Sequence, residues 1–160
     1  MVRPGSVTKA GNLNLGCQAI VRVCERALLT AAGLRSLAAS EAGYRRSFGG
    51  DPATRDSAYH QRTVWAWLIG PFIEAHLNVF GDPDHVERIL HPMQDHLRIE
   101  GLGTMNEIFE AEPPYAPRGC IAQAWSVAAI LRAHGLIERF KLTRHGVSPV
   151  EKASSRVIVD

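Results

Sequence analysis

The sequence predicts an all-α fold, and three observations support this prediction. Apolar residues recur at helical spacing in four separate segments, residues that cap helices flank several of them, and only the last five residues resemble a strand. With 160 residues, the chain is long enough for one domain with a sizeable core and short for two. We therefore expect one helical domain over residues 1–140 and a polar, flexible tail over residues 141–160.

The first predicted helix covers residues 17–28, and Gly33 is expected to close it. Residues 41–56 are rich in glycine and polar residues and predict a long loop, a kind of segment that is often functional. The side chains predicted to form the buried face of this helix are Cys17, Ile20, Val21, Cys24 and Leu28, while Arg22, Glu25 and Arg26 face away.

The second predicted helix covers residues 63–79, with Thr63 as its cap and a bend at Pro71. The third begins at Asp82, the predicted N-cap, and Pro83, which suits the first helical position. The fourth ends near Gly135, and the final "RVIVD" is the one segment that resembles a strand. The apolar positions that define the fourth helix are Ile121, Ala124, Trp125, Ala128 and Leu131.

Composition and spacing argue against several classes of protein. The net charge of +2, without a basic cluster, argues against nucleic-acid binding. Three cysteines without a CxxC pair argue against a disulfide framework and favour a cytoplasmic protein. The first 16 residues lack the apolar core of a signal peptide, and no stretch is apolar enough to span a membrane.

Histidines are frequent but lack a metal-binding spacing such as HExxH. His85, His91 and His96 fit the exposed face of the third helix, so neither a metal site nor a cofactor is expected. No GxSxG or phosphate-binding glycine motif is present.

The stretch "AYHQRTVWAWLIGPFIEAH" from residue 58 is rich in flat side chains that carry a polar group. Sugars present C–H faces that stack on aromatic rings and hydroxyl groups that need polar partners, so these side chains suit a carbohydrate cleft. The alternative, of similar weight, is that the tryptophans are core residues at a helix entrance. The residues with such side chains are Tyr59, His60, Gln61, Trp65 and Trp67.

Carboxylates gather in a second loop, "NEIFEAEPPYAPRG", between residues 106 and 119. Cleavage of a glycosidic bond generally needs two carboxyl groups, and Glu107 is a candidate for one of these roles. Surface carboxylates far outnumber catalytic ones, so Glu110 and Glu112 are expected to be solvated loop charges, and the same alternative stays open for Glu107 taken alone.

Three segments, in order, resemble the amylo-α-1,6-glucosidase domain of bacterial and archaeal glycogen debranching enzymes. They are "LLTAAGLRSLA" from residue 28, "YRRSFGGDPATRDSAYHQRTVWAWLIGPFIEAHLNVFGD" from residue 44, and "GLGTMNEIFEAEPPYAPRGCIAQAWSVAAILRA" from residue 101. The resemblance implies a toroid of helical hairpins, (α/α)6, that hydrolyses α-1,6-glucosidic branch points in an α-glucan such as glycogen or limit dextrin. Four helices are too few for the whole ring, so a partial toroid is expected.

The resemblance also implies roles for individual residues. Glu107 matches the catalytic base of an inverting, two-carboxylate mechanism, whose general acid lies in an upstream segment without a counterpart here. The positions that match residues lining or supporting the sugar site are Tyr59, His60, Gln61, Trp65, Trp67, Gln123 and Trp125.

Two departures from the family pattern bear on function. Arg62 replaces a glycine of "HQGTVWPW", and its long cationic side chain would either fill space next to the sugar or require a carboxylate partner, for which Glu110 and Glu112 are candidates. The missing general acid predicts a fragment that is inactive alone. A second hypothesis is a carbohydrate-binding or assembly half that pairs with a separately encoded N-terminal part, and a third is a small helical protein that does not bind sugar.

Overall fold

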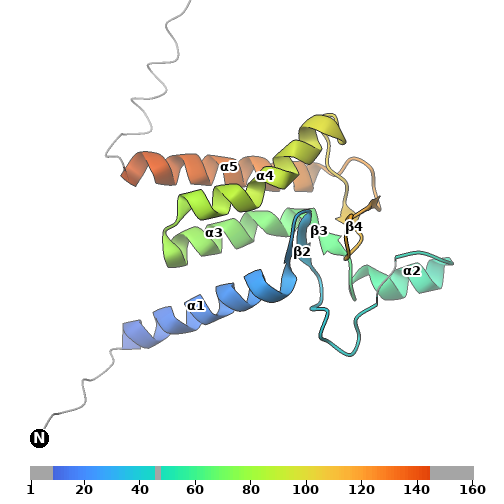
Figure 1. The fold of residues 1–160 in the computed structure, drawn as a ribbon, viewed down its shortest axis with the longest axis horizontal. Helices are drawn as coiled ribbons and strands as arrows, with labels where there is room; N and C mark the ends of the chain where they lie inside the picture. The colour runs from blue at the N-terminus through green and yellow to red at the C-terminus, as the bar shows by residue number, and fades with distance from the viewer. Residues whose placement is uncertain (1–8, 46–47, 145–160) are drawn as a thin grey trace, which may run out of the picture.

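A computed structural model describes residues 9–45 and 48–144 of the chain (Figure 1). The chain is mostly helical, with a small antiparallel sheet. The helices are α1 (Lys9–Leu28), α2 (Pro52–Tyr59), a 3-10 turn η1 (Ala66–Leu68), α3 (Ile69–Phe80), α4 (Pro83–Ile99) and α5 (Ala124–Arg144). The strands are β1 (Leu29–Thr30), β2 (Gly33–Arg35), β3 (Val64–Trp65), β4 (Ile108–Phe109) and β5 (Pro117–Arg118).

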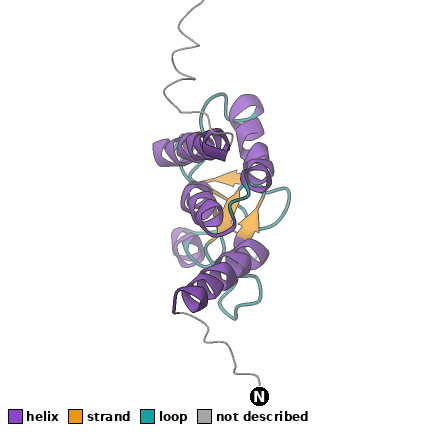
Figure 2. Cartoon of the chain, turned by 90° about the vertical axis from the view of Figure 1, so that its left-hand side faces the viewer, coloured by secondary structure: helices purple, strands orange, loops and turns teal. Residues whose placement is uncertain are grey.

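Four of the helices form one packed group. α5 contacts both α3 and α4, and α1 contacts α3. α2 lies apart from this group, beyond the strands, at the end of the molecule where the loops gather (Figure 1). The strands lie between helices in the second view (Figure 2).

The sheet corrects the prediction of an all-α fold. Its strands are two or three residues long and lie in chain order, β1-β2-β3-β4-β5, each antiparallel to the next. Trp65 pairs with Leu34 on one side and with Ile108 on the other. Such short strands leave almost no period-two pattern in the sequence, and for this reason they were not predicted. The sheet brings the segments around residues 30, 65 and 108 together.

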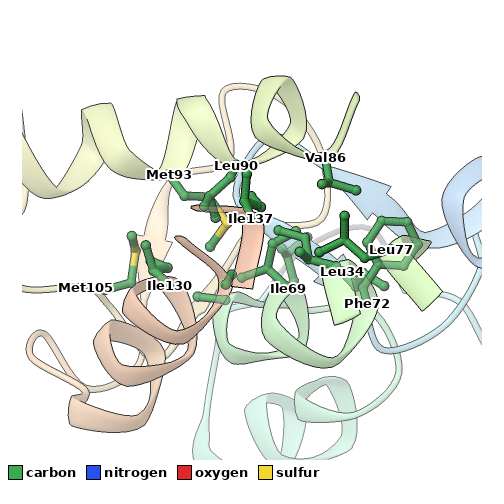
Figure 3. Packing of buried hydrophobic residues seen from close by; sticks show 14 of the residues in the cluster. Leu34, Ile69, Phe72, Leu77, Val86, Leu90, Met93, Met105, Ile130 and Ile137 are labelled. Atoms are coloured by element: carbon green, nitrogen blue, oxygen red, sulfur yellow. The ribbon is translucent and has the colours of Figure 1, made fainter. Parts of the chain in front are cut away.

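The core lies among the helices and includes residues of β2, β3 and β4 (Figure 3). Ile69 and Ile73 of α3 are fully buried, and they belong to the same cluster as Leu90 of α4 and Ile130 of α5. Burial of such side chains contributes about 1.5–3 kcal/mol each, so this cluster dominates the stability of the fold.

The first helix is longer than predicted and only partly buried. It ends at Leu28, and Gly33 lies in β2 instead of closing the helix. A Cβ atom at Gly33 would lie 2.4 Å from the Trp65 carbonyl oxygen, so glycine is required by the close approach of two strands. Val21 is buried, but Cys17 and Ile20 are exposed, contrary to prediction.

The second helix starts later than predicted. Val64 and Trp65 are extended and pair with two strands, and α3 begins at Ile69 without a side-chain cap. The Thr63 hydroxyl instead donates a hydrogen bond to the Tyr59 carbonyl oxygen, 2.5 Å away. Pro71 is the third residue of α3, where a missing N–H removes no helical hydrogen bond, so the predicted bend is not required.

The loop predicted over residues 41–56 contains the start of α2. Asp51 caps this helix by accepting a hydrogen bond from the Thr54 N–H at 2.9 Å, and Pro52 occupies the first helical position. The signals that predicted α4 are confirmed in the same way, because the Asp82 side chain accepts from the His85 N–H at 3.0 Å.

The fourth helix differs most from prediction. α5 continues through Gly135 to Arg144, so residues 141–144 are helical. Its buried side chains are Ser126, Ile130, Ala133 and Ile137, whereas the apolar positions that predicted the helix, Ala124, Trp125, Ala128 and Leu131, are exposed, as is Ile121 before it. The helix is therefore apolar on two faces, of which α3 and α4 cover one.

Two further observations complete the fold. No helix within residues 9–45 and 48–144 is both long and apolar enough to cross a membrane. The segment resembling a strand at residues 156–160 and most of the predicted tail lie outside the described residues.

Candidate active site

Glu107 immediately precedes β4, and both of its carboxylate oxygens are held by the protein. The Tyr59 hydroxyl donates to Oε1 at 2.5 Å, and the Cys120 backbone N–H donates to Oε2 at 3.2 Å. The Glu107 backbone N–H in turn donates to the Cys120 carbonyl oxygen at 2.9 Å. These bonds fix the orientation of the carboxylate, while each oxygen keeps a lone pair that a further donor could use.

The absence of a side chain at Gly119 leaves room for the Glu107 carboxylate. Its φ of +67° lies in the left-handed region, and a Cβ atom there would lie 2.6 Å from Glu107 Oε2. Every other residue would therefore carry both backbone strain and a clash with the carboxylate.

Tyr59 reaches Glu107 from the last residue of α2. Burial and the hydrogen bond to Glu107 raise the pKa of Tyr59 to about 12, so its hydroxyl stays protonated and remains a donor at neutral pH. The Tyr59 ring meets the edges of the His60 and Trp65 rings, at centroid distances of 4.9 and 4.8 Å. His60 and Trp65 stack on each other at 5.3 Å, with ring planes 2° apart.

The aromatic residues of residues 58–76 therefore separate into two environments. Trp65 is buried in β3 against Tyr59 and His60, as a core residue would be. Trp67 is 36% exposed and lies beside the exposed Trp125, with ring centroids 6.1 Å apart. The Trp67–Trp125 pair edges an open, mainly apolar hollow of about 300 Å³ between α3 and α5.

Gln61 and Gln123 lie in two separate loops. Gln61 is exposed at the turn after α2, with its side-chain oxygen close to Gly43. Gln123 precedes α5, and its backbone N–H donates to the Met105 carbonyl oxygen at 2.8 Å. This bond ties the start of α5 to the loop that leads to Glu107.

Arg62 is fully buried and forms an ion pair with Glu110, which favours the second of the two alternatives, a carboxylate partner. Glu110 also accepts from Arg118 Nε and from the Phe48 N–H, both at 3.1 Å. The prediction that Glu110 is a solvated loop charge is therefore wrong, because no sequence pattern showed that Arg62 would be buried beside it.

Glu112 does not join this network. It is exposed and accepts a hydrogen bond from the Tyr44 hydroxyl at 2.5 Å. Arg62 has no exposed surface, so it lies beneath the loops and does not project into an open groove.

An open groove of about 550 Å³ begins at Tyr59 and runs along α2. Sequence reasoning did not single out several of the side chains that line it, because they come from separate elements and form no recognisable motif. Those of interest are Phe48, Arg55, Asp56 and Arg118, which lie with Tyr59 and Gly119 on its walls. Polar and aromatic groups around an open hollow can bind a hydroxylated ligand.

Glycoside hydrolases use two carboxyl groups that flank the sugar, and a carboxylate fixed next to this groove fits one of those two roles. Within that class, the chain belongs to the amylo-α-1,6-glucosidase family, because the family model of that description matches residues 11–132. The match covers most of the chain and includes both Tyr59 and Glu107. No curated protein matches the chain.

Proposed function

We propose that this chain is the C-terminal part of a glycogen-debranching α-1,6-glucosidase domain and supplies the catalytic base, Glu107. The substrate is an α-glucan, such as glycogen or limit dextrin, at its α-1,6 branch points. Membership of the amylo-α-1,6-glucosidase family supports the substrate class. One observation carries the assignment of the base: Glu107 is held at both oxygens, by Tyr59 and by the Cys120 N–H.

The proposed mechanism is inverting. Glu107 accepts a proton from a water molecule, which attacks the anomeric carbon from the face opposite the leaving oxygen. The Tyr59 hydroxyl and the Cys120 N–H orient the carboxylate, and the free lone pairs receive the water. The second carboxyl group, which protonates the leaving oxygen, comes from outside this chain.

The sugar would contact the side chains named from the resemblance. The exposed Trp67 and Trp125 offer rings on which the C–H faces of glucose units can stack. His60 and Trp65 support Tyr59 through their ring contacts. Gln61 and Gln123 complete the set, as polar groups at the rim.

We propose that the chain alone hydrolyses little or no glucan. General acid catalysis contributes about 10²–10⁴-fold, and this contribution is missing without the second carboxyl group. The exposed apolar residues support an incomplete ring. Trp125 is 50% exposed and Leu131 is 63% exposed on the outer face of α5, and Ile20 is 65% exposed on α1.

The same faces favour a second candidate function, that of an assembly half. A helix that is apolar on two faces is normally buried on both, so α5 is suited to lie inside a larger helical array. A separately encoded N-terminal part would cover Leu131 and complete a toroid of helical hairpins. The three cysteines are free thiols, which supports a cytoplasmic location for such an assembly.

The test combines binding with hydrolysis. Maltooligosaccharides and limit dextrin are titrated into the purified chain while tryptophan fluorescence is recorded, and free glucose is then assayed. We expect saturable binding that Trp67→Ala weakens, with almost no glucose released. An unchanged fluorescence signal would contradict the proposed glucan site, and rapid glucose release would contradict the proposed absence of the acid.

A further inference from the structure

We propose that Glu25, His76 and His85 form a binding site for one divalent transition-metal ion of the Zn²⁺ type. The three residues come from three different helices, α1, α3 and α4. One potential ligand atom from each lies within 4.8 Å of the other two. This site shares no residue with the candidate active site and is independent of the proposed function.

The distances fit an ion at the centre of the group. Glu25 Oε1 lies 2.7 Å from His85 Nε2, and Glu25 Oε2 lies 3.8 Å from His76 Nε2. Ligands bound tetrahedrally to zinc at roughly 2.0–2.1 Å are about 3.3 Å apart. The two observed distances lie on either side of this value and involve different oxygens of one carboxylate, so binding an ion requires a small rotation of the Glu25 carboxylate.

The donor types select the class of ion. Two imidazole nitrogens and one carboxylate suit zinc and its neighbours in the first transition row, whereas Mg²⁺ and Ca²⁺ prefer oxygen ligands.

Packing fixes the histidine rings. The His76 ring contacts Phe80 at 4.8 Å and Phe72 at 6.1 Å, and it stacks on the His85 ring at 4.9 Å. The buried Nδ1 of His76 has no hydrogen-bond partner among the described residues, so ring packing sets its orientation. A preformed arrangement of this kind reduces the ordering cost of binding an ion.

The site is open to solvent on one side. A hollow of about 310 Å³ leads to it, and water molecules there could complete the coordination. Its walls add Arg22, Phe80 and Asp82 to the three ligands. Arg22 lies over the Phe80 ring at 5.1 Å, and the Asp82 carboxylate adds a negative charge at the rim.

The test is a titration of the full chain, freed of metal by chelation, with ZnCl₂ and separately with MgCl₂. Isothermal calorimetry should give one Zn²⁺ per chain and no comparable binding of Mg²⁺. At a hundredfold excess over Kd, Zn²⁺ should raise the thermal midpoint by roughly 5–10 °C. Failure to saturate below about 1 mM Zn²⁺ would overturn the proposal.

Variants assign the ligands. Glu25→Gln and His85→Gln should each weaken Zn²⁺ binding by at least about tenfold. His91→Gln is the matched control, because His91 lies on the same helix but is exposed and pairs with Asp95. Cys24→Ser controls for thiol binding on α1 and should bind Zn²⁺ as the wild type does.

The outcomes are decisive in both directions. Circular dichroism verifies the fold of each variant before titration, and if one ligand variant does not fold, the other decides. The assignment would be overturned if His91→Gln weakened Zn²⁺ binding as much as the ligand variants do. It would also be overturned if Zn²⁺ binding were unchanged in both ligand variants, or weakened only in Cys24→Ser.

Discussion

The Tyr59 hydroxyl donates a hydrogen bond to Glu107 Oε1 at 2.5 Å, across 48 positions of the sequence. The bond joins the end of α2 to the residue that precedes β4, and it holds the carboxylate that we propose as the catalytic base. Because Glu107 lies in a loop, its orientation depends on such long-range bonds more than on local structure.

The first prediction concerns the pH dependence of stability. Burial and the hydrogen bond to Glu107 raise the pKa of Tyr59 from 10.0 to about 12, so the folded chain holds this proton where the unfolded chain has lost it. The resulting stabilisation is present below pH 10 and is lost as the pH rises towards about 12. Urea unfolding at pH 8, 10 and 11 should show a steeper loss for the wild type than for Tyr59→Phe. Tyr115→Phe is the control, and equal slopes in Tyr59→Phe and the wild type would refute the prediction.

The second prediction compares two glycines with positive φ. Gly119→Ala should destabilise the chain by about 2–4 kcal/mol, because backbone strain adds to a clash with the Glu107 carboxylate. Gly103→Ala should cost only about 1 kcal/mol, because Gly103 has a φ of +90° but no atom within 4 Å of an added Cβ. Urea unfolding measures the free energy of unfolding of both variants. An equal cost for the two variants would contradict a destabilising clash between the added Cβ atom and the Glu107 carboxylate.

The third prediction concerns the buried ion pair. Glu110→Gln should cost about 3–5 kcal/mol, because it leaves the fully buried Arg62 without a carboxylate. Glu112→Gln, at an exposed carboxylate, should cost no more than about 0.5 kcal/mol. A double-mutant cycle of Arg62→Met with Glu110→Gln should show a coupling energy of at least about 1 kcal/mol. Additive single effects would contradict a direct interaction.

The fourth prediction uses two neighbouring residues of α5. Ile130 is 1% exposed and Leu131 is 63% exposed. Ile130→Ala should therefore destabilise the chain by about 2–5 kcal/mol, and Leu131→Ala by no more than about 0.5 kcal/mol. Thermal unfolding of the two variants shows which face of α5 lies in the core. A large cost for Leu131→Ala would mean that its face is already covered in the isolated chain.

Local signals predicted the parts of the fold that depend on nearby residues. Asp82 followed by Pro83 marked the start of α4, because both the cap and the fixed φ of proline act within one helical turn. The strand at Val64 and Trp65 was not predicted, because its two residues are held by partners at Leu34 and Ile108, far along the chain. Tertiary pairing therefore overrode the helical pattern there.

The burial of α5 could not be read from its periodicity. Apolar residues occupy two faces, and the sequence offers no means of choosing between them. The apolar positions that predicted the helix include Trp125 and Leu131, whereas the structure buries Ile130 and Ile137. The burial of Arg62 beside Glu110 and the cluster of Glu25 with His76 and His85 were equally hidden, because each joins residues from separate elements.

The central claim is tested most directly by complementation. The chain, wild type or Glu107→Gln, is mixed with the N-terminal part of an amylo-α-1,6-glucosidase domain that carries the general acid, and glucose release from limit dextrin is followed with the anomer identified. We expect no release from either part alone, release of β-glucose from the wild-type mixture, and a rate at least about 10³-fold lower with Glu107→Gln. Equal activity of the Glu107→Gln mixture, or full activity of the chain alone, would contradict the account.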